Sequence, residues 1–359
     1  MTDQKKLKQT VRGRMRRTGE SYTTAHRQVT ARRGEPLYLH RPSYLVRELL
    51  AATGAPLSEP MVCGLGGGIG FLYAVFEYKT APHPLLTIVA QHHPQPWATA
   101  VLDRLGVTYV EQHSAALTPA VAKLRATLDR GLVLCTVDRT GLHEGLSELM
   151  SADPYPVLVT AATADSVTVV DDGPPREVPL ATFGAAWSGH RKGRHHQLSI
   201  TTTPASLPLD AATQDAIATT AAHLTGPVLG NAFDVNFGFS GMAKLIEDLR
   251  ATKGKTAWAN RFAACFDYLM PRLVECLQRE YTAPDATRPL YAAFLTEVGR
   301  TDAAAEIAAA GREWAAVTAL AGASGEIAVG GRRERLDELA RLVSAGLDHE
   351  IRAMHLLKR

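Results

Sequence analysis

The sequence predicts an α+β protein in two parts, a mixed region of helices and strands over residues 34–203 and an all-α helical region over residues 210–359. Within the first part, helical and strand patterns alternate and then give way to closely spaced strands. Three threonines and two prolines in Thr201–Leu209 are typical of a linker, which we place at residues 204–209. Beyond it the apolar spacing is almost entirely helical.

Length and composition describe a globular protein. A chain of 359 residues accommodates two domains with separate cores, and 46% hydrophobic with 21% charged residues argues against extensive disorder. No apolar run approaches the length of a membrane span, and none follows the N-terminal Met1, so we expect no membrane partner and a cytoplasmic location.

The cysteines show neither of the spacings that indicate a redox pair or a zinc site. Cys63, Cys135, Cys265 and Cys276 form no Cys-x-x-Cys pair, and the pairs His92-His93 and His195-His196 do not have the ligand spacing of a helix. We therefore expect no disulfide framework, no metal and no cofactor. The cysteines are interpreted as small buried hydrophobes.

The net charge of +3 is unevenly distributed. Residues 1–33 carry ten Lys or Arg against Asp3 and Glu20, a local balance of +8, so the remainder sums to −5. This basic N-terminal arm is interpreted either as a dock for an acidic partner, such as a carrier protein or nucleic acid, or as a solvated extension.

The elements of the first part follow in order. Apolar residues at helical spacing predict a buried helix over Ser43–Thr53, which Gly54 ends as a C-cap. Strand and helix then alternate, a pattern that alone would suggest a doubly wound sheet. The predicted ranges are strand 85–89, helix 96–105, strand 108–111, helix 117–129 and strand 132–137.

After residue 154 the pattern changes to close-spaced strands. Tyr155–Ala161 and Ser166–Val170 are joined by a short turn and predict a hairpin, followed by a helix over Leu180–Trp187 and a strand over Gln197–Thr203. Such an order predicts a first helix packed on an antiparallel sheet. The second part is predicted to be a bundle with helices over residues 211–224, 238–249, 258–281, 290–297, 303–320 and 334–356.

Five glycines in the seven residues Gly64–Gly70 form the most distinctive motif of the chain. They lie between two apolar, helix-like segments and indicate a turn specified by its backbone. The run lacks the spacing of a dinucleotide-binding loop and the ending of a phosphate-binding loop. We interpret it as close backbone packing that lines a cleft. Cys63, Gly66, Gly67 and Gly68 are candidate substrate-binding positions there, as are Arg41 and Asp138 elsewhere in the chain.

Together with His40–Leu50, the glycine run resembles the N-terminal domain of the family of butirosin-biosynthesis protein H. The resemblance implies a papain-like, cysteine-peptidase-like fold, which some members use for acyl transfer. In the second part Asn231–Gly241 and Leu290–Glu297 resemble the helical domain of unknown function that follows this domain. The resemblance thus covers roughly residues 37–356.

The family's catalytic residues are only partly present. Its cysteine follows a histidine at the start of the first helix, and here the matching run His40-Arg-Pro-Ser43 has Arg41 at that position. Its histidine opens the strand before the hairpin, where this chain has Pro156, or Tyr155 if the register slips by one. The aspartate that orients that histidine is retained as Asp171 or Asp172. Because a serine depends on a base more than a thiol does, Ser43 is a poor replacement nucleophile.

Seven residues remain as candidates around the expected cleft: His40, Arg41, Ser43, Asp138, His143, Tyr155 and Asp171. His40 is either a base or anion contact, or a histidine that only hydrogen-bonds at the start of a helix. Arg41 at a helix N-terminus favours a carboxylate or phosphate, or else a structural salt bridge. Ser43 is either a nucleophile or a helix cap, and His143 lies in a loop as a site residue or as an exposed neutral side chain.

Three functions are compatible with these observations. The first is an acyl- or aminoacyl-transferase-like enzyme of specialised, antibiotic-type metabolism with an altered site, whose substrate is an acyl group on a carrier protein or a peptidyl small molecule, as the resemblance implies. The second is a catalytically inactive papain-like binding protein of a biosynthetic pathway. The third is a non-covalent cyclase or isomerase. Apolar helical faces over residues 290–356 suit a homodimer interface or an internal core.

Overall fold

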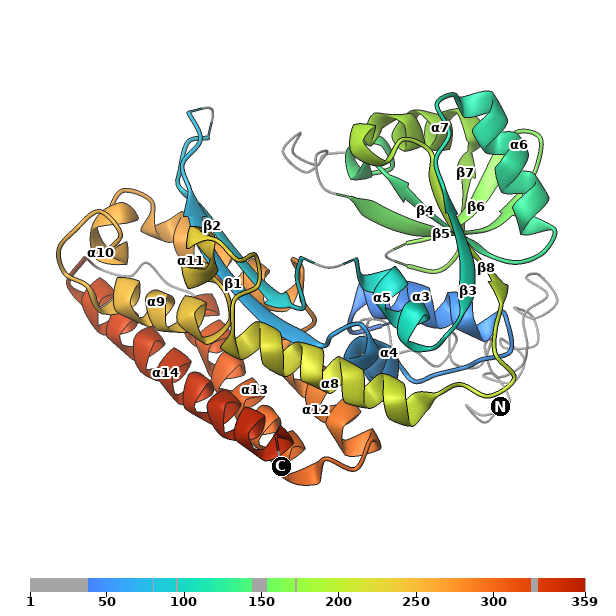
Figure 1. The fold of residues 1–359 in the computed structure, drawn as a ribbon. Coiled ribbons are helices and arrows are strands. Elements are labelled where there is room, and N and C mark those ends of the chain that lie inside the picture. The colour runs from blue at the N-terminus through green and yellow to red at the C-terminus, as the bar shows by residue number, and fades with distance from the viewer. Residues whose placement is uncertain are drawn as a thin grey trace, which may run out of the picture.

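The computed structural model describes residues 38–79, 81–94, 96–143, 154–171, 173–323 and 329–358 (Figure 1). The predicted basic arm, residues 1–33, lies outside this part of the chain, as does Asp172. The fold combines helices with two antiparallel sheets, so the α+β prediction is confirmed.

A six-stranded antiparallel sheet with strand order β3-β8-β4-β5-β6-β7 forms one half of the molecule (Figure 1). Its strands are β3 (Thr108–Gln112), β4 (Val133–Val137), β5 (Tyr155–Ala162), β6 (Ser166–Val170), β7 (Arg176–Pro179) and β8 (His196–Thr202). Five of them were predicted. The edge strand β7 was missed because its four residues include two charges and a proline, which depart from the usual strand composition. Because all pairings are antiparallel, a doubly wound sheet is excluded.

Helices cover both faces of this sheet. Helix α3 (Arg41–Ala51) buries Leu45, Val46 and Leu49 against one face, and α5 (Trp97–Arg104) adds to the same core. The opposite face packs on α6 (Leu117–Leu128) and α7 (Leu180–Gly189). Neighbouring residues of a strand point to opposite faces, so Leu134 joins the α3 core and Cys135 joins the other. The prediction of a first helix packed on an antiparallel sheet is confirmed.

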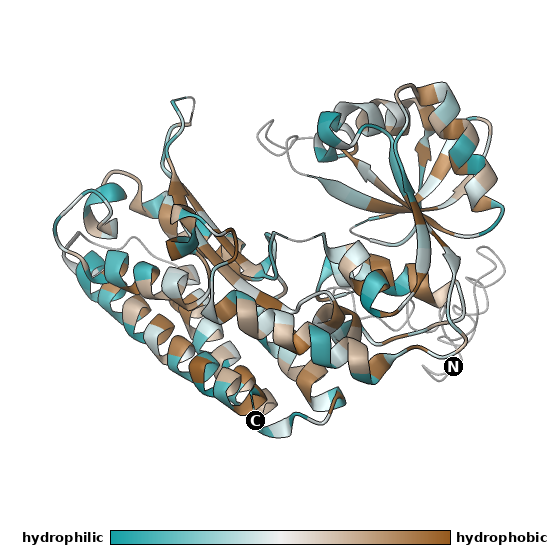
Figure 2. Ribbon diagram, viewed as in Figure 1, coloured by the Kyte–Doolittle hydropathy of each residue, from teal (hydrophilic) through white to brown (hydrophobic). Residues whose placement is uncertain are grey.

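A separate hairpin of β1 (Ile69–Phe76) and β2 (Leu85–Gln91) follows α4 (Glu59–Leu65). The segment after the glycine run was predicted to be helix-like, which is wrong. Its alternating side chains pair with β2 in a strand, and the aromatic Phe71 and Tyr73 enter the core beside the C-terminal helices. Apolar residues, brown in Figure 2, lie along the strands of this hairpin and along the strands of the larger sheet.

The second half is helical over its described residues, apart from one isolated bridge between Leu72 and Phe237. Its helices are α8 (Leu209–Thr225), α9 (Gly238–Arg250), α10 (Trp258–Arg261), α11 (Phe266–Gln278), α12 (Arg288–Glu297), α13 (Thr301–Gly322) and α14 (Arg332–Leu357). The single helix predicted over residues 258–281 is two helices, because the chain leaves helical geometry around Cys265.

The packing boundary differs from the predicted linker. Residues 203–208 do lie between β8 and α8 without regular structure. Yet the core of the helical half contains Phe71, Tyr73, Leu86 and Ile88 of the hairpin, which lie far earlier in the chain. The helices after residue 209 are therefore not a separate packing unit, since their core is completed by β1 and β2.

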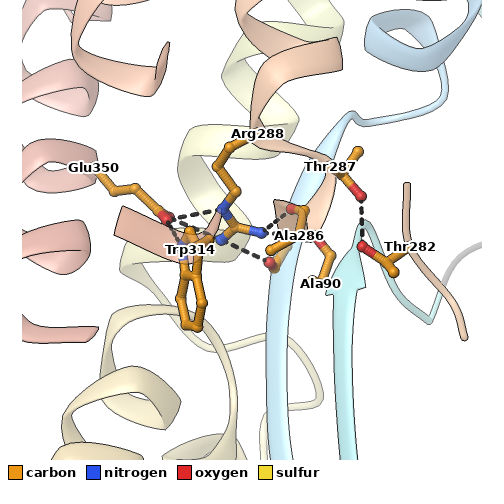
Figure 3. A network of polar contacts seen from close by, with 8 residues as sticks. Ala90, Thr282, Ala286, Thr287, Arg288, Trp314 and Glu350 are labelled. Carbon is orange, nitrogen blue, oxygen red and sulfur yellow. Dashed lines mark hydrogen bonds and ion pairs between the residues drawn. The ribbon is translucent and has the colours of Figure 1, made fainter. Parts of the chain in front are cut away.

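A buried ion pair fastens the hairpin to three helices (Figure 3). Arg288 of α12 and Glu350 of α14 are both fully buried, with N–O distances of 2.8 and 2.9 Å. Trp314 of α13 donates its indole N–H to the same carboxylate at 3.1 Å. The guanidinium also donates to the carbonyls of Ala90 at 2.8 Å and Gly70 at 3.1 Å, which belong to β2 and β1.

Replacing Glu350 with Gln is expected to lower the free energy of unfolding by about 3–5 kcal/mol, because it leaves the Arg288 charge buried without a counter-ion. Denaturant unfolding followed by circular dichroism measures this loss. The matched control is Glu338→Gln, which removes an exposed partner of Arg341 and is expected to leave the unfolding midpoint unchanged. Equal midpoints for the two variants would contradict the prediction.

Replacing Gly66 with Ala is expected to cost about 1–3 kcal/mol of stability by overpacking. A Cβ atom at Gly66 would lie closer than 3.0 Å to the Trp97 ring, although the backbone at Gly66 is in the ordinary helical region. Gly131→Ala is the control, because a Cβ atom there meets nothing within 4 Å. Unfolding free energies measured in urea test the pair, and a Gly66→Ala variant as stable as Gly131→Ala would refute the packing argument.

Candidate functional site

The candidate site lies where the N-terminus of α3 meets the ends of β4, β5 and β6. Pro42 in the first turn suits a helix start, where a missing N–H costs nothing. His40 precedes the helix, but its side chain does not cap it. Instead the Glu59 carboxylate accepts the backbone N–H groups of Leu39 at 2.8 Å and His40 at 2.6 Å. This contact ties the start of α3 to α4.

A buried chain of hydrogen bonds runs behind the helix start. His40 contacts Ser43 Oγ through Nδ1 and Gln91 Oε1 through Nε2, both at 2.7 Å. An amide oxygen only accepts, so Nε2 carries the proton and Nδ1 accepts from the Ser43 hydroxyl. Cys63 hydrogen-bonds to Ser43, while burial raises the pKa of its thiol. His40, Ser43 and Cys63, all candidates from the sequence, are therefore neighbours.

None of these three side chains is exposed to solvent, each having a relative exposure of 0%. Burial lowers the pKa of His40 to about 4, against the opposing effect of the hydrogen bond that His40 donates to Gln91. His40 is neutral at pH 7 and links α3, α4 and β2 through hydrogen bonds. An attack by Ser43 on a substrate would require this packing to open.

Arg41, the first residue of α3, turns toward the sheet. Its guanidinium lies over the ring of Tyr155, with Cζ 3.7 Å from the ring centroid, and donates to the carbonyl of Pro156. Arg139 lies over the same ring at 4.9 Å. Two guanidinium groups on one aromatic ring place concentrated positive charge at the start of β5.

His143 approaches the same ring from the loop after β4. Its Nε2 is 3.4 Å from the Tyr155 hydroxyl and 3.2 Å from Asp171 Oδ2. The Asp171 carboxylate, which is 2% exposed at the end of β6, also accepts from Arg176 at 2.7 Å. A histidine paired with a buried aspartate is an arrangement that orients a ring for proton transfer.

Asp138 shapes the loop that carries Arg139 and His143. Its side chain accepts the Thr140 backbone N–H at 2.9 Å and the Thr140 hydroxyl at 2.7 Å, which caps a short 3₁₀ turn, η1 (Arg139–Gly141). The structure thus gives Asp138 a local role in holding the loop. Asp138 lies next to the site because it belongs to the loop that carries Arg139 and His143.

The candidate glycines lie against side chains of the surrounding elements. Cβ atoms at Gly66, Gly67 and Gly68 would lie closer than 3.0 Å to Trp97, His92 and Tyr291 respectively. Gly67 and Gly68 also have φ angles of 103° and 61°, which favour glycine. The close backbone packing predicted from the sequence is confirmed by these approaches.

The structure brings the sequence candidates together in two groups. Arg41, Tyr155, His143 and Asp171 converge at the sheet end, whereas His40, Ser43 and Cys63 form the buried chain. Sequence reasoning missed Gln91, Arg139 and Arg176. Gln91 follows an apolar strand as an isolated polar residue, which is a weak signal. The position of Arg139 in a loop, next to the candidate Asp138, was a stronger signal.

No group of three or more His, Cys, Asp or Glu side chains suited to a metal ion occurs among the described residues. Within the same ranges, no helix is both long enough and apolar enough to cross a membrane.

Helix α3 packs on an antiparallel sheet and begins at a cluster of polar side chains, which defines an α+β protein with a candidate site at the N-terminus of this helix. Residues 40–172 match the family model for butirosin biosynthesis protein H, N-terminal. The match begins at His40 and includes both groups of candidate residues. The resemblance seen in the sequence is confirmed for this segment. A comparison with curated proteins finds no match.

The depressed pKa of His40 predicts a pH dependence of stability. The unfolded histidine titrates near 6.5 and the folded one near 4, so the unfolded state binds more protons between these values. Stability from this group is fully present above pH 6.5 and is lost as the pH falls to about 4. The loss amounts to about 3 kcal/mol.

Urea unfolding of the wild type and of His40→Gln between pH 7.5 and 3.5 measures this effect. Subtracting the unfolding free energy of the variant from that of the wild type at each pH removes the contributions of the other groups that titrate in this range. The wild type is expected to lose more stability than the variant between pH 6.5 and 4. Parallel curves would show that His40 titrates normally in the folded state.

Proposed function

We propose that this chain is an acyl- or aminoacyl-transferase-like protein of specialised metabolism, with a papain-like N-terminal domain whose site works without a cysteine nucleophile. The observation that carries the proposal is the convergence of Arg41, Tyr155, His143 and Asp171. These side chains come from α3, β5, the loop after β4 and the end of β6. His143 takes the place of the family's missing histidine, and Asp171 orients it.

The cysteines support a mechanism without a thiolate. Burial raises the pKa of each of the four thiols, Cys63, Cys135, Cys265 and Cys276. A thiol nucleophile needs a lowered pKa. Direct transfer therefore suits this site better than an acyl-cysteine intermediate.

In direct transfer, an amine acceptor attacks the carbonyl carbon of an acyl thioester. The C–N bond forms, the C–S bond breaks, and His143 takes the proton that the amine loses and delivers it to the leaving thiolate. Arg41 and Arg139 would bind an anionic group of the substrate, since guanidinium groups match carboxylate and phosphate geometry. The acyl donor is proposed to be a carrier-protein or pantetheine thioester.

A second candidate function is a binding protein of a biosynthetic pathway that does not turn over a substrate. One observation favours it: the Arg41 guanidinium fills the nucleophile position, stacked on Tyr155 and bonded to the Pro156 carbonyl. The His143–Asp171 pair would also serve a non-covalent cyclase or isomerase. The dock for an acidic partner on residues 1–33, the homodimer and the cytoplasmic location stay predictions.

Thiol release tests the transferase. Incubation with a panel of acyl- and aminoacyl-pantetheine thioesters and amine acceptors is expected to release free thiol and to form an amide product without a covalent adduct at the His143 site. His143→Gln is expected to slow release by about 100-fold, because a general base contributes at least that much. Thiol detection and intact-protein mass spectrometry measure both outcomes.

The control variant is His83→Ala, which removes an exposed histidine whose ring lies 5.1 Å from that of Tyr268, away from the site. It is expected to release thiol at the wild-type rate. Release that is unaffected by His143→Gln would remove His143 from the mechanism. No release across the panel would favour the binding protein.

A further inference from the structure

A second polar group crosses three strands at the same end of the six-stranded sheet. Thr136 of β4 contacts His196 Nδ1 of β8 through Oγ1 at 2.9 Å, and His196 Nε2 contacts Glu111 Oε1 of β3 at 2.8 Å. Thr136 is paired in register with His196 on one side and Pro156 on the other. Directly opposed residues share a face of the sheet. The group therefore adjoins the Arg41 site but shares no residue with it.

The direction of the hydrogen bonds follows from the chemistry of the partners. A carboxylate only accepts, so the proton on the ring lies on His196 Nε2 and points to Glu111. Nδ1 then carries a lone pair and accepts a hydrogen bond from the Thr136 hydroxyl. A hydroxyl that donates to an imidazole whose other nitrogen is held by a carboxylate has the arrangement of an activated nucleophile.

The surroundings of His196 keep the ring neutral and able to accept a proton. Burial lowers the pKa of His196, the Glu111 carboxylate raises it, and the neighbouring His113 and His190 lower it further. The His113 and His196 rings are 5.2 Å apart. The Glu111 side chain is 45% exposed, and Thr136 is only partly buried, so this group is open to solvent on one side.

Two serine–histidine contacts elsewhere in the described residues differ from the group of Thr136, His196 and Glu111. The pair of Ser43 and His40 is fully buried and ends on an amide rather than a carboxylate. Ser188 contacts His195 Nε2, but the other nitrogen of that ring is held by the Ser114 carbonyl rather than by a carboxylate. The Thr136 group combines a donated hydroxyl proton, a carboxylate and partial exposure.

We propose that Thr136, His196 and Glu111 form a second site, in which Thr136 is acylated by activated acyl donors. The Thr136 oxygen attacks the acyl carbon as its proton passes to His196 Nδ1, and the ring gives this proton to the alcohol or thiol of the donor as the bond to the acyl carbon breaks. Water then attacks the ester carbon and gives one proton to His196, and the ring delivers that proton to the threonine oxygen as the carboxylic acid leaves. Glu111 is a positioning residue that fixes the ring. This proposal is independent of transfer at His143.

Reaction with p-nitrophenyl acetate tests the site in the full-length protein. We expect a burst of p-nitrophenolate close to one equivalent and a single acetyl group on Thr136, identified by intact mass and peptide mapping. Thr136→Val is expected to abolish the adduct, and Thr136→Ser, which restores a hydroxyl, is expected to retain it. Thr168→Val, at a partly buried threonine on β6 of the same sheet, is the matched control and keeps the wild-type burst.

His196→Gln is expected to slow acylation by about 100-fold. Glu111→Gln is expected to shift the acid limb of the acylation rate to lower pH, because removal of the carboxylate lowers the pKa of His196. A purely structural role of Glu111 would change the rate without moving that limb. Circular dichroism of each variant checks that the fold is kept.

Acetylation that maps to another residue, a burst unchanged in Thr136→Val, or no adduct with the wild type would each overturn the proposal. His143→Gln separates the two sites. Retained acetylation of Thr136 in that variant, together with lost thioester transfer, supports both. Retained transfer without a Thr136 adduct overturns the second site alone.

Discussion

The ion pair between Arg288 and Glu350 connects the two halves of the molecule. Arg288 donates to the carbonyl of Ala90, and the next residue, Gln91, contacts His40 in front of α3. Helices near the C-terminus thus position the strand that holds the start of the site helix. A buried pair of this kind contributes little stability by itself, because its desolvation offsets its attraction. The five hydrogen bonds that Arg288 donates and the one that Glu350 accepts from Trp314 connect β1, β2, α12, α13 and α14.

The glycine run is the second constraint on this arrangement. The chain turns there from α4 into β1 while Trp97, His92 and Tyr291 press on its backbone. Side chains at Gly66, Gly67 or Gly68 would separate α5 and α12 from the turn. The run therefore lets elements from both halves approach one another, which explains why a domain boundary near residue 204 does not describe the packing.

Polar side chains gather at one end of the six-stranded sheet because several strands begin or end there. Tyr155 opens β5, Asp171 follows β6, and His196 opens β8. The α3 helix brings Arg41 to the same place. This end of the sheet carries the guanidinium groups of Arg41 and Arg139 and two imidazoles that are each paired with a carboxylate, His143 and His196.

Sequence by itself determined most of the local structure. Apolar periodicity predicted five strands of the large sheet and most of the helices, since these patterns reflect one buried face. It also predicted tight packing at the glycines and the set Arg41, His143, Tyr155 and Asp171. Tertiary structure decided what periodicity does not encode: the strand after the glycine run, the hairpin's place in the helical core, and the burial of His40 and Ser43. These features depend on contacts between distant residues, such as Arg288 with Glu350 and His40 with Gln91, whose spacing in the chain carries no local signal.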